Sequence, residues 1–236
     1  MKNLSLSYFK NLKFSSTILL FILVAFSACK KEEEIDNTLS NIRVINAAPT
    51  LATYYPFINS GLISSAALPY GGSTAYNANI SGANTIKFTA ENNTESLLTK
   101  TVNLNANSYY SFYLINKPGA LDGLVIADDL SLPAADKTYI RYINLSPDAP
   151  AMDLAKTGET TALIANKTYK TASAFIAIAP GTYTFDAKET STGTVKAISS
   201  SATFVAGYHY DIICGGLINP ANDTERTINI VTVMLK

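Results

Sequence analysis

The feature that most constrains the fold of this chain is an internal duplication. Similar residues recur in five blocks, in which Ile42–Pro49 matches Ile140–Pro147, Tyr70 and Tyr76 match Tyr169 and Phe175, Gly82 matches Gly181, Thr85–Phe88 matches Thr182–Phe185, and Tyr110–Leu114 matches Tyr210–Cys214. The offset between matched residues stays between 97 and 100. Such a constant offset indicates two copies of one structural unit.

Each copy has the pattern of β-strands. Apolar residues alternate with polar ones over Thr85–Ala90 in the first copy and over Thr182–Ala187 in the second. A period of two is typical of a strand buried on one face. Turn-forming pairs such as Pro180-Gly181 separate the apolar runs. The chain is therefore predicted to be all-β, with two tandem immunoglobulin-like β-sandwich modules.

The patterns divide the chain into five segments. We expect a cleaved signal peptide at residues 1–28, a charged flexible tether at 29–40, sandwich repeats at 41–131 and 139–236, and a linker at 132–138. Because the linker is only seven residues long, the two modules are expected to touch.

The N-terminus has the layout of a secretory signal. Three lysines are the only charged residues among the first 28, and the apolar run Ile18–Phe26 follows them before two small residues. The apolar run is too short to cross about 30 Å of hydrocarbon as a helix. A cleaved signal is therefore favoured over a retained membrane helix.

Cys29 follows the small residues directly. The tetrapeptide Phe26–Cys29 resembles a lipobox, the site at which bacterial lipoprotein signal peptidase cuts before an acylated cysteine, although Phe stands where Leu is usual. The resemblance implies a membrane anchor of several acyl chains on Cys29, which would hold the protein firmly. The alternative is an ordinary secretory signal that happens to end in a cysteine.

The charged run Lys30–Glu34 comes next and is predicted to be a solvated tether. It also resembles the export signal of Bacteroidetes surface lipoproteins, which implies a place on the outer face of the outer membrane. Plain solvation is the alternative explanation for such a run.

The composition excludes some partners. Without the three lysines of the predicted signal, the chain has 15 basic and 18 acidic residues. Its basic residues form no stripe of the kind that would indicate a nucleic-acid partner. Only Cys214 remains after Cys29, so the modules must be stabilised by core burial without an internal disulfide.

The second copy opens with a motif that identifies a family. Ile140–Leu154, with its Ser-Pro-Asp-Ala-Pro turn, and the strand Ala206–Asp211 resemble the domain of unknown function 4397. Asn144 stands where many members have His, and the first copy, at Ala47–Leu51, lacks the Asp-Ala-Pro turn. The resemblance implies tandem copies of a secreted or anchored β domain, and the family has no assigned activity.

Two side chains are candidates for catalysis. His209 is the only histidine, and Asp211 shares its strand face, but the first copy has Tyr109 and Ser111 at these positions. We therefore expect His209 to lie on an exposed strand face without a catalytic role. Cys214 is expected on the core face, where burial makes a thiol inert.

Carboxylates are the remaining candidates for a metal site. Asp148 and Asp153 flank the turn of the second copy, but two carboxylates are too few for calcium, and Asp148 is better explained as a turn residue that bonds backbone N–H groups. Asp128 and Asp129 are expected at a solvated strand end. No metal or other cofactor is expected.

Tyr109 and Tyr113 are the candidate ligand-binding residues. Both lie on the strand face opposite the predicted core face, where tyrosines can stack on sugars, anchor a protein partner, or simply pair across strands. Three functions follow: a non-enzymatic surface module that binds or spaces a protein or polysaccharide partner, which is preferred; a glycan-binding accessory subunit of an outer-membrane nutrient-uptake system; and a glycoside hydrolase that uses carboxylates alone.

Overall fold

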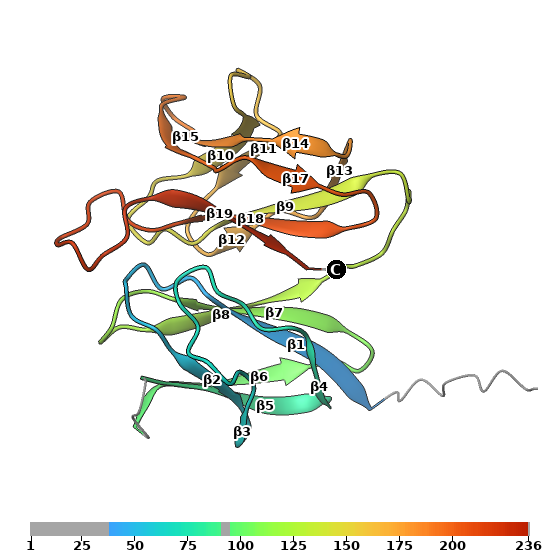
Figure 1. Ribbon diagram of the computed structural model, residues 1–236, viewed down its shortest axis with the longest axis vertical. Helices are drawn as coiled ribbons and strands as arrows, with labels where there is room; N and C mark the ends of the chain where they lie inside the picture. Colours follow the sequence, from blue (N-terminus) through green and yellow to red (C-terminus); the bar gives the residue numbers. More distant parts are fainter. Residues whose placement is uncertain (1–37, 91–94, 236) are drawn as a thin grey trace, which may run out of the picture. The chain divides into compact units, whose positions relative to one another are not determined.

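The computed structural model describes residues 38–90 and 95–235. Throughout these two ranges the secondary structure consists of strands and turns, with no helix. The prediction of an all-β fold built from sandwiches is confirmed (Figure 1). The described part of the chain accordingly contains no helix that is long and apolar enough to cross a membrane. The predicted signal peptide, Cys29 and the charged run behind it lie outside the described residues.

The first half of the described chain forms a sandwich that we call module 1. Its strands are β1 (Leu39–Asn46), β2 (Tyr55–Ile58), β3 (Gly61–Leu62), β4 (Asn77–Ile80), β5 (Gly82–Thr89), β6 (Ser96–Leu104), β7 (Tyr109–Ile115) and β8 (Asp122–Asp128). One sheet has the order β4-β1-β7-β8 and the other the order β3-β2-β5-β6. Between the sheets lies an apolar core that includes Ile42, Phe88 and Phe112, all fully buried.

The second half forms module 2. Its strands are β9 (Thr138–Asn144), β10 (Met152–Lys156), β11 (Ile164–Lys167), β12 (Thr171–Ala172), β13 (Ile176–Ile178), β14 (Gly181–Tyr183), β15 (Phe185–Glu189), β16 (Val195–Ile198), β17 (Ala202–Phe204), β18 (His209–Gly215) and β19 (Asn229–Met234). The sheets have the orders β12-β9-β18-β19 and β11-β10-β15-β16, and β14 pairs with β17. The core includes Tyr142, Leu154 and Phe185.

The two modules pair their strands in the same way. In module 1 the first strand runs parallel to β7 and places Arg43 beside Ser111, and in module 2 β9 runs parallel to β18 and places Arg141 beside Asp211. In each module the next strand, β8 or β19, pairs antiparallel at the edge of that sheet. The strand pairing thus repeats along the chain, as the matched sequence blocks do.

The sheets that carry β1 and β9 face each other (Figure 1). A third apolar cluster joins them, formed by Ile45, Ala47, Tyr113, Ile115, Ile143, Leu145, Ile213 and Val233. The modules therefore touch, as the short linker predicts. Burying a Val, Leu or Ile side chain contributes about 1.5–3 kcal/mol, and most members of this cluster are of that kind, so it stabilises the contact between the modules.

Four strands at this interface are buried on both faces. Every residue of β9 and β18 is buried, as is nearly all of β1 and β7. The alternation of β1 explains why: Ile42 and Val44 enter the core of module 1, whereas Arg43 and Ile45 point to module 2. The face that the sequence pattern assigned to solvent is covered by the other module.

Candidate functional site at the module interface

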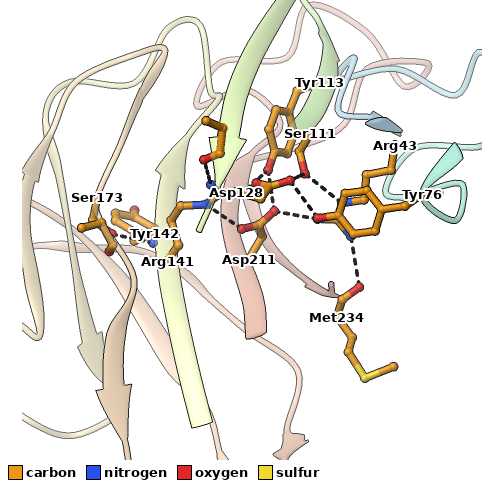
Figure 2. A network of polar contacts seen from close by, with 12 residues as sticks. Arg43, Tyr76, Ser111, Tyr113, Asp128, Arg141, Tyr142, Ser173, Asp211 and Met234 are labelled. Carbon is orange, nitrogen blue, oxygen red and sulfur yellow. Dashed lines mark hydrogen bonds and ion pairs between the residues drawn. The ribbon is translucent and has the colours of Figure 1, made fainter. Parts of the chain in front are cut away.

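Four charged side chains are buried where the modules meet. Arg43 and Arg141 are each 2% exposed, Asp128 is 6% exposed and Asp211 is fully buried. Figure 2 shows them converging from β1, β9, β8 and β18. Isolated charges are very costly to bury, so such a cluster persists only if its members are paired and hydrogen-bonded.

Asp211 lies at the centre of the cluster. Its Oδ1 accepts a hydrogen bond from Arg141 Nε at 2.8 Å, and its Oδ2 accepts one from Arg43 Nη2 at 2.8 Å. The hydroxyl of Tyr113 also donates to Oδ2. One carboxylate of module 2 therefore neutralises an arginine of each module.

Asp128 is the second acid of the cluster. Its Oδ1 accepts from Arg141 Nη2 at 2.7 Å, and its Oδ2 accepts from Ser111 Oγ at 2.7 Å and from Tyr76 Oη at 2.8 Å. Asp128 belongs to module 1 and Arg141 to module 2, so this ion pair also crosses the interface. The four formal charges sum to zero.

The arginine contacts are nearly symmetric between the modules. Arg43 Nη1 donates to the carbonyl of Met234 in module 2 at 3.1 Å, and Arg141 Nη1 donates to the carbonyl of Ala127 in module 1 at 3.2 Å. Ala127 pairs with Tyr110, and Met234 pairs with the matched Tyr210, so the two carbonyls occupy equivalent positions. Reciprocal contacts of this kind are the pattern of an interface between two like subunits.

Aromatic rings cover both guanidinium groups. Arg43 lies over Tyr76 at 5.5 Å from the ring centroid, and Arg141 lies over the matched Phe175 at 4.6 Å. Such cation–π contacts are stronger where water is excluded. The matched aromatic residues of the repeat thus serve the interface rather than the module cores.

The cluster changes the acid–base properties of its members. Burial alone would lower the pKa of Arg141, but the carboxylates of Asp211 and Asp128 outweigh it and hold that pKa above its ordinary value. Burial, and then the charge of Asp211, raises the pKa of Tyr113 well above its ordinary value. Both groups therefore keep their protons across the physiological range.

Three expectations about exposure are wrong. Tyr113 is fully buried, because the second module covers its strand face, so its ring is not a stacking surface in this structure. Asp128 is an interface ion-pair residue and not a solvated strand end. His209 is 2% exposed, with its ring stacked on Tyr139 at 4.8 Å and meeting the edge of Phe175 at 4.8 Å.

The expectation for Cys214 is confirmed. The thiol is fully buried in the core of module 2, and burial raises its pKa to about 12. Asp148 binds backbone N–H groups as expected, but those of Ile218 and Asn219, which are distant in sequence, at 2.9 Å each. Asp153 accepts from the N–H of Asn166 at 2.7 Å. Within residues 38–90 and 95–235, no three His, Cys, Asp or Glu side chains form a group that could hold a metal ion.

Tyr109 lies in a hollow at one end of the interface. This Tyr109 hollow, about 480 Å³ in volume, is lined by Asn107, Ser108, Tyr109, Ala127, Asp128, Asp129, Leu130 and Ser131. Its residues come from the start of β7, the end of β8 and the chain that leads to module 2. The ring of Tyr109 meets Tyr76 at 5.1 Å with an interplanar angle of 88°.

A second hollow, of about 570 Å³, lies where the long β18–β19 connection reaches module 1. This Lys117 hollow is lined by Thr50, Leu51, Ala52, Lys117, Pro118, Thr224 and Glu225. Leu51 N donates to Thr224 O at 2.9 Å, and Lys117 forms an ion pair with Glu225 at 2.9 Å.

Sequence reasoning missed Arg43 and Arg141 as site residues. The available signal was an arginine repeated inside two otherwise apolar strands, with an aspartate in only one copy of the partner strand. An arginine inside an apolar strand needs a buried acid, and Asp211, on the neighbouring strand, is the residue that supplies it.

Comparison with known families and structures gives limited guidance. The model of a family described as "Domain of unknown function (DUF4397)" matches residues 40–155, which span module 1 and the first two strands of module 2. No curated protein matches the chain.

Two solved structures are similar at a low level. The first is described as "Alpha-glucan binding by a streptococcal virulence factor"; it is 12% identical, has a TM-score of 0.24, and the similarity covers 80% of this chain and 96% of that one. The second is the family CBM26 module CBMbc from Eubacterium rectale Amy13K in complex with maltoheptaose, with 8% identity, a TM-score of 0.24, and 80% and 100% coverage. Similarity this low carries over neither the strand connections nor the ligands of those proteins.

Proposed function

We propose that the protein is a lipid-anchored, surface-exposed module of the outer membrane that binds a partner, or spaces one from the membrane, without catalysing a reaction. The single observation that carries the proposal is the interface, which joins two sandwiches through an apolar cluster and a neutral cluster of buried charges. Domains move relative to each other by default unless their interface is large and apolar. This chain therefore presents a rigid two-module body at the end of its predicted tether.

The groups that could perform chemistry support a binding role. His209 is enclosed by aromatic rings, Cys214 lies in the core, and Asp211 is committed to both arginines. A glycosidase mechanism needs two carboxyl groups that reach the substrate. In the Tyr109 hollow, both oxygens of Asp128 are already bonded, which leaves Asp129 as the accessible acid of that hollow.

The anchor is tested by labelling cells with a radioactive fatty acid. Label is expected on the wild-type chain, and Cys29→Ala should remove it and release the protein from the membrane fraction. Cys214→Ala is the matched control, because Cys214 is the only other cysteine, and this variant should keep the label. Equal labelling of Cys29→Ala and wild type would refute the anchor.

Surface exposure is tested separately by treating intact cells with protease. The proposal expects digestion of the protein on intact cells. Protection that ends only when the cells are lysed would place the protein on the periplasmic side.

A further inference from the structure

We propose that one end of the two-module body rests on the surface of a lipid bilayer, so that both modules touch the membrane to which the chain is anchored. We call it the entry end, and it is the end at which β1, β7, β9 and β18 begin. The inference rests on the lipid anchor proposed above. It is carried by the way in which exposed apolar side chains and charges are divided between the two ends of the body.

The interface strands of both modules begin at the same end. Arg43, in the first half of β1, donates to the carbonyl of Met234, which is the last residue of β19. At the opposite end, which we call the far end, Lys117 follows β7 and pairs with Glu225 in the connection that follows β18. Figure 1 shows the start of β1 and the C-terminus on the same side of the molecule. The entry end is therefore formed by both modules together.

Exposed apolar side chains from separate segments lie at the entry end. Ile80, which pairs with the first residue of β1, is 72% exposed, and Met234 is 56% exposed. Val205 and Tyr208 are exposed in the turn before β18, and Leu132 is exposed in the chain that links the modules. These five are half of the ten large apolar side chains that are exposed in the described part of the chain. Such a concentration marks a surface that contacts a protein or a membrane.

Charges are distributed in the opposite way. The turns of the entry end carry Asp129 and one ion pair, between Asp136 and Lys137 at 3.3 Å. Apolar side chains and tyrosine rings can enter the boundary of a bilayer without attraction from anionic lipids, whereas charged groups favour water. The far end is rich in charged residues of both signs: Lys117, Asp122, Lys170, Asp223, Glu225 and Arg226.

The length of chain before the first strand favours a bilayer as the partner. The predicted anchor, Cys29, precedes Thr38 by nine residues, and β1 begins at Leu39. Nine residues span at most about 30 Å even when they are fully extended. The entry end is therefore kept close to the lipid headgroups. This tethering raises the effective concentration of the membrane, so contacts that are too weak to bind a free protein can hold this end.

The orientation has a consequence for the binding role. With the entry end on the bilayer, the two modules lie side by side on the membrane, because both contribute to that end. The far end and its Lys117 hollow then point away from the lipid. They form the surface that a soluble partner reaches first.

The test uses the lipidated full chain in vesicles of phosphatidylethanolamine, with and without brominated acyl chains that quench tryptophan fluorescence. The natural sequence contains no tryptophan, so one substitution creates a single probe. Tyr208→Trp, at the entry end, should be quenched by the brominated lipid. Leu51→Trp is the matched control, because Leu51 is exposed to a similar degree at the far end, and its fluorescence should stay unchanged.

A charge at the entry end should weaken the contact. In the chain that carries Tyr208→Trp, Ile80→Asp or Val205→Asp should lower the ratio of docked to undocked protein about fivefold, because a carboxylate replaces an apolar contact. Leu51→Asp should leave the quenching as it was. All three positions are exposed, so the melting temperature should not change.

The outcomes separate this inference from the anchor. If the chain floats with the vesicles but Tyr208→Trp is not quenched, or is quenched no more than Leu51→Trp, the contact is wrong and the anchor stands. Unchanged quenching in both aspartate variants would also overturn the contact. If the full chain does not float with the vesicles at all, the anchor and the contact are both wrong.

Discussion

The two modules share one strand arrangement but place different residues at one matched position of their interface. Each supplies an arginine at the matched positions 43 and 141, and the neighbouring strand then differs, with Ser111 in module 1 and Asp211 in module 2. Arg43 Nε donates to Ser111 Oγ at 2.8 Å, just as Arg141 Nε donates to Asp211 Oδ1 at 2.8 Å. The geometry is conserved between the modules while the charge is not.

This difference shows how a repeated interface can become specific. Two arginines need two carboxylates, and these come from non-equivalent places, the middle of the interface at Asp211 and the end of β8 at Asp128. Each module therefore carries one arginine and one acid of the cluster. The charges of each half therefore cancel, but the ion pairs Arg43–Asp211 and Arg141–Asp128 both cross the interface.

The largest expected effect comes from Asp211→Asn. The change leaves Arg43 without its carboxylate and deprives Arg141 of one of two, at a fully buried site. We expect the free energy of unfolding to fall by about 3–5 kcal/mol. Denaturant unfolding measures this, with the exposed Asp129→Asn as control, and a loss under about 1 kcal/mol would show that the cluster is not needed.

The two arginines should differ in importance. Arg141→Met removes the partner of both acids, whereas Arg43→Met leaves Asp211 paired with Arg141. We expect Arg141→Met to be more destabilising than Arg43→Met by about 1–2 kcal/mol. Equal losses in the same denaturant experiment would mean that the cluster is symmetric in energy as well as in shape.

One matched position of the interface has room for a side chain in module 1 but only for a glycine, Gly215, in module 2. Gly215 lies where module 1 has Ile115, and a Cβ there would come within 2.4 Å of the Tyr70 hydroxyl. Gly215→Ala should cost about 1–3 kcal/mol. Tyr70→Phe removes the clashing hydroxyl, so the double variant should lose less than the sum of the single changes. If the stability losses of the two single variants add up in the double variant, the Tyr70 hydroxyl is not the source of the strain.

The smallest effect concerns pH. Burial lowers the pKa of His209, so the folded protein binds a proton less readily than the unfolded chain. Stability is then complete above the unfolded pKa of about 6.5 and falls as the pH drops below it. His209→Phe keeps the ring stack and should flatten the profile between about pH 7 and 5. An unchanged slope in that window would show that other groups cause it.

Acidic groups act in a separate pH window. Hydrogen bonds from Lys196 and from the backbone of Ala221 lower the pKa of Glu189 and Glu225 respectively. Their contribution is present above the unfolded pKa of about 4.3 and is lost as the pH falls through the folded one. The His209 variant should therefore match the wild type in its response below about pH 4.

The sequence predicted the fold well because both signals were local. Period-two alternation predicts strands wherever a face is buried, and the constant offset predicts that the second half repeats the first. The interface was harder to predict, since alternation cannot show whether a polar face meets water or another module. Arg43 and Tyr113 look like exposed strand residues until the position of the second sheet is known.

The site residues also differ in whether local alternation predicts their environment. Cys214 lies on the predicted core face, and its burial followed directly from alternation. His209 and Asp211 lie on the opposite face. Their burial depends on residues distant in the chain, Tyr139 and Phe175 for His209 and Arg43 for Asp211. The neighbours of Tyr109 are likewise set by the strand register, which brings Asn41 beside it.

The account rests most on the claim that the interface makes the two modules one cooperative body. Native-state hydrogen exchange across a series of denaturant concentrations tests it directly, by comparing core amides of β5 in module 1 with those of β15 in module 2. We predict that both sets exchange through the same opening, with equal free energies and equal dependence on denaturant, and that Asp211→Asn separates them. Two distinct opening reactions in the wild-type protein would contradict the account.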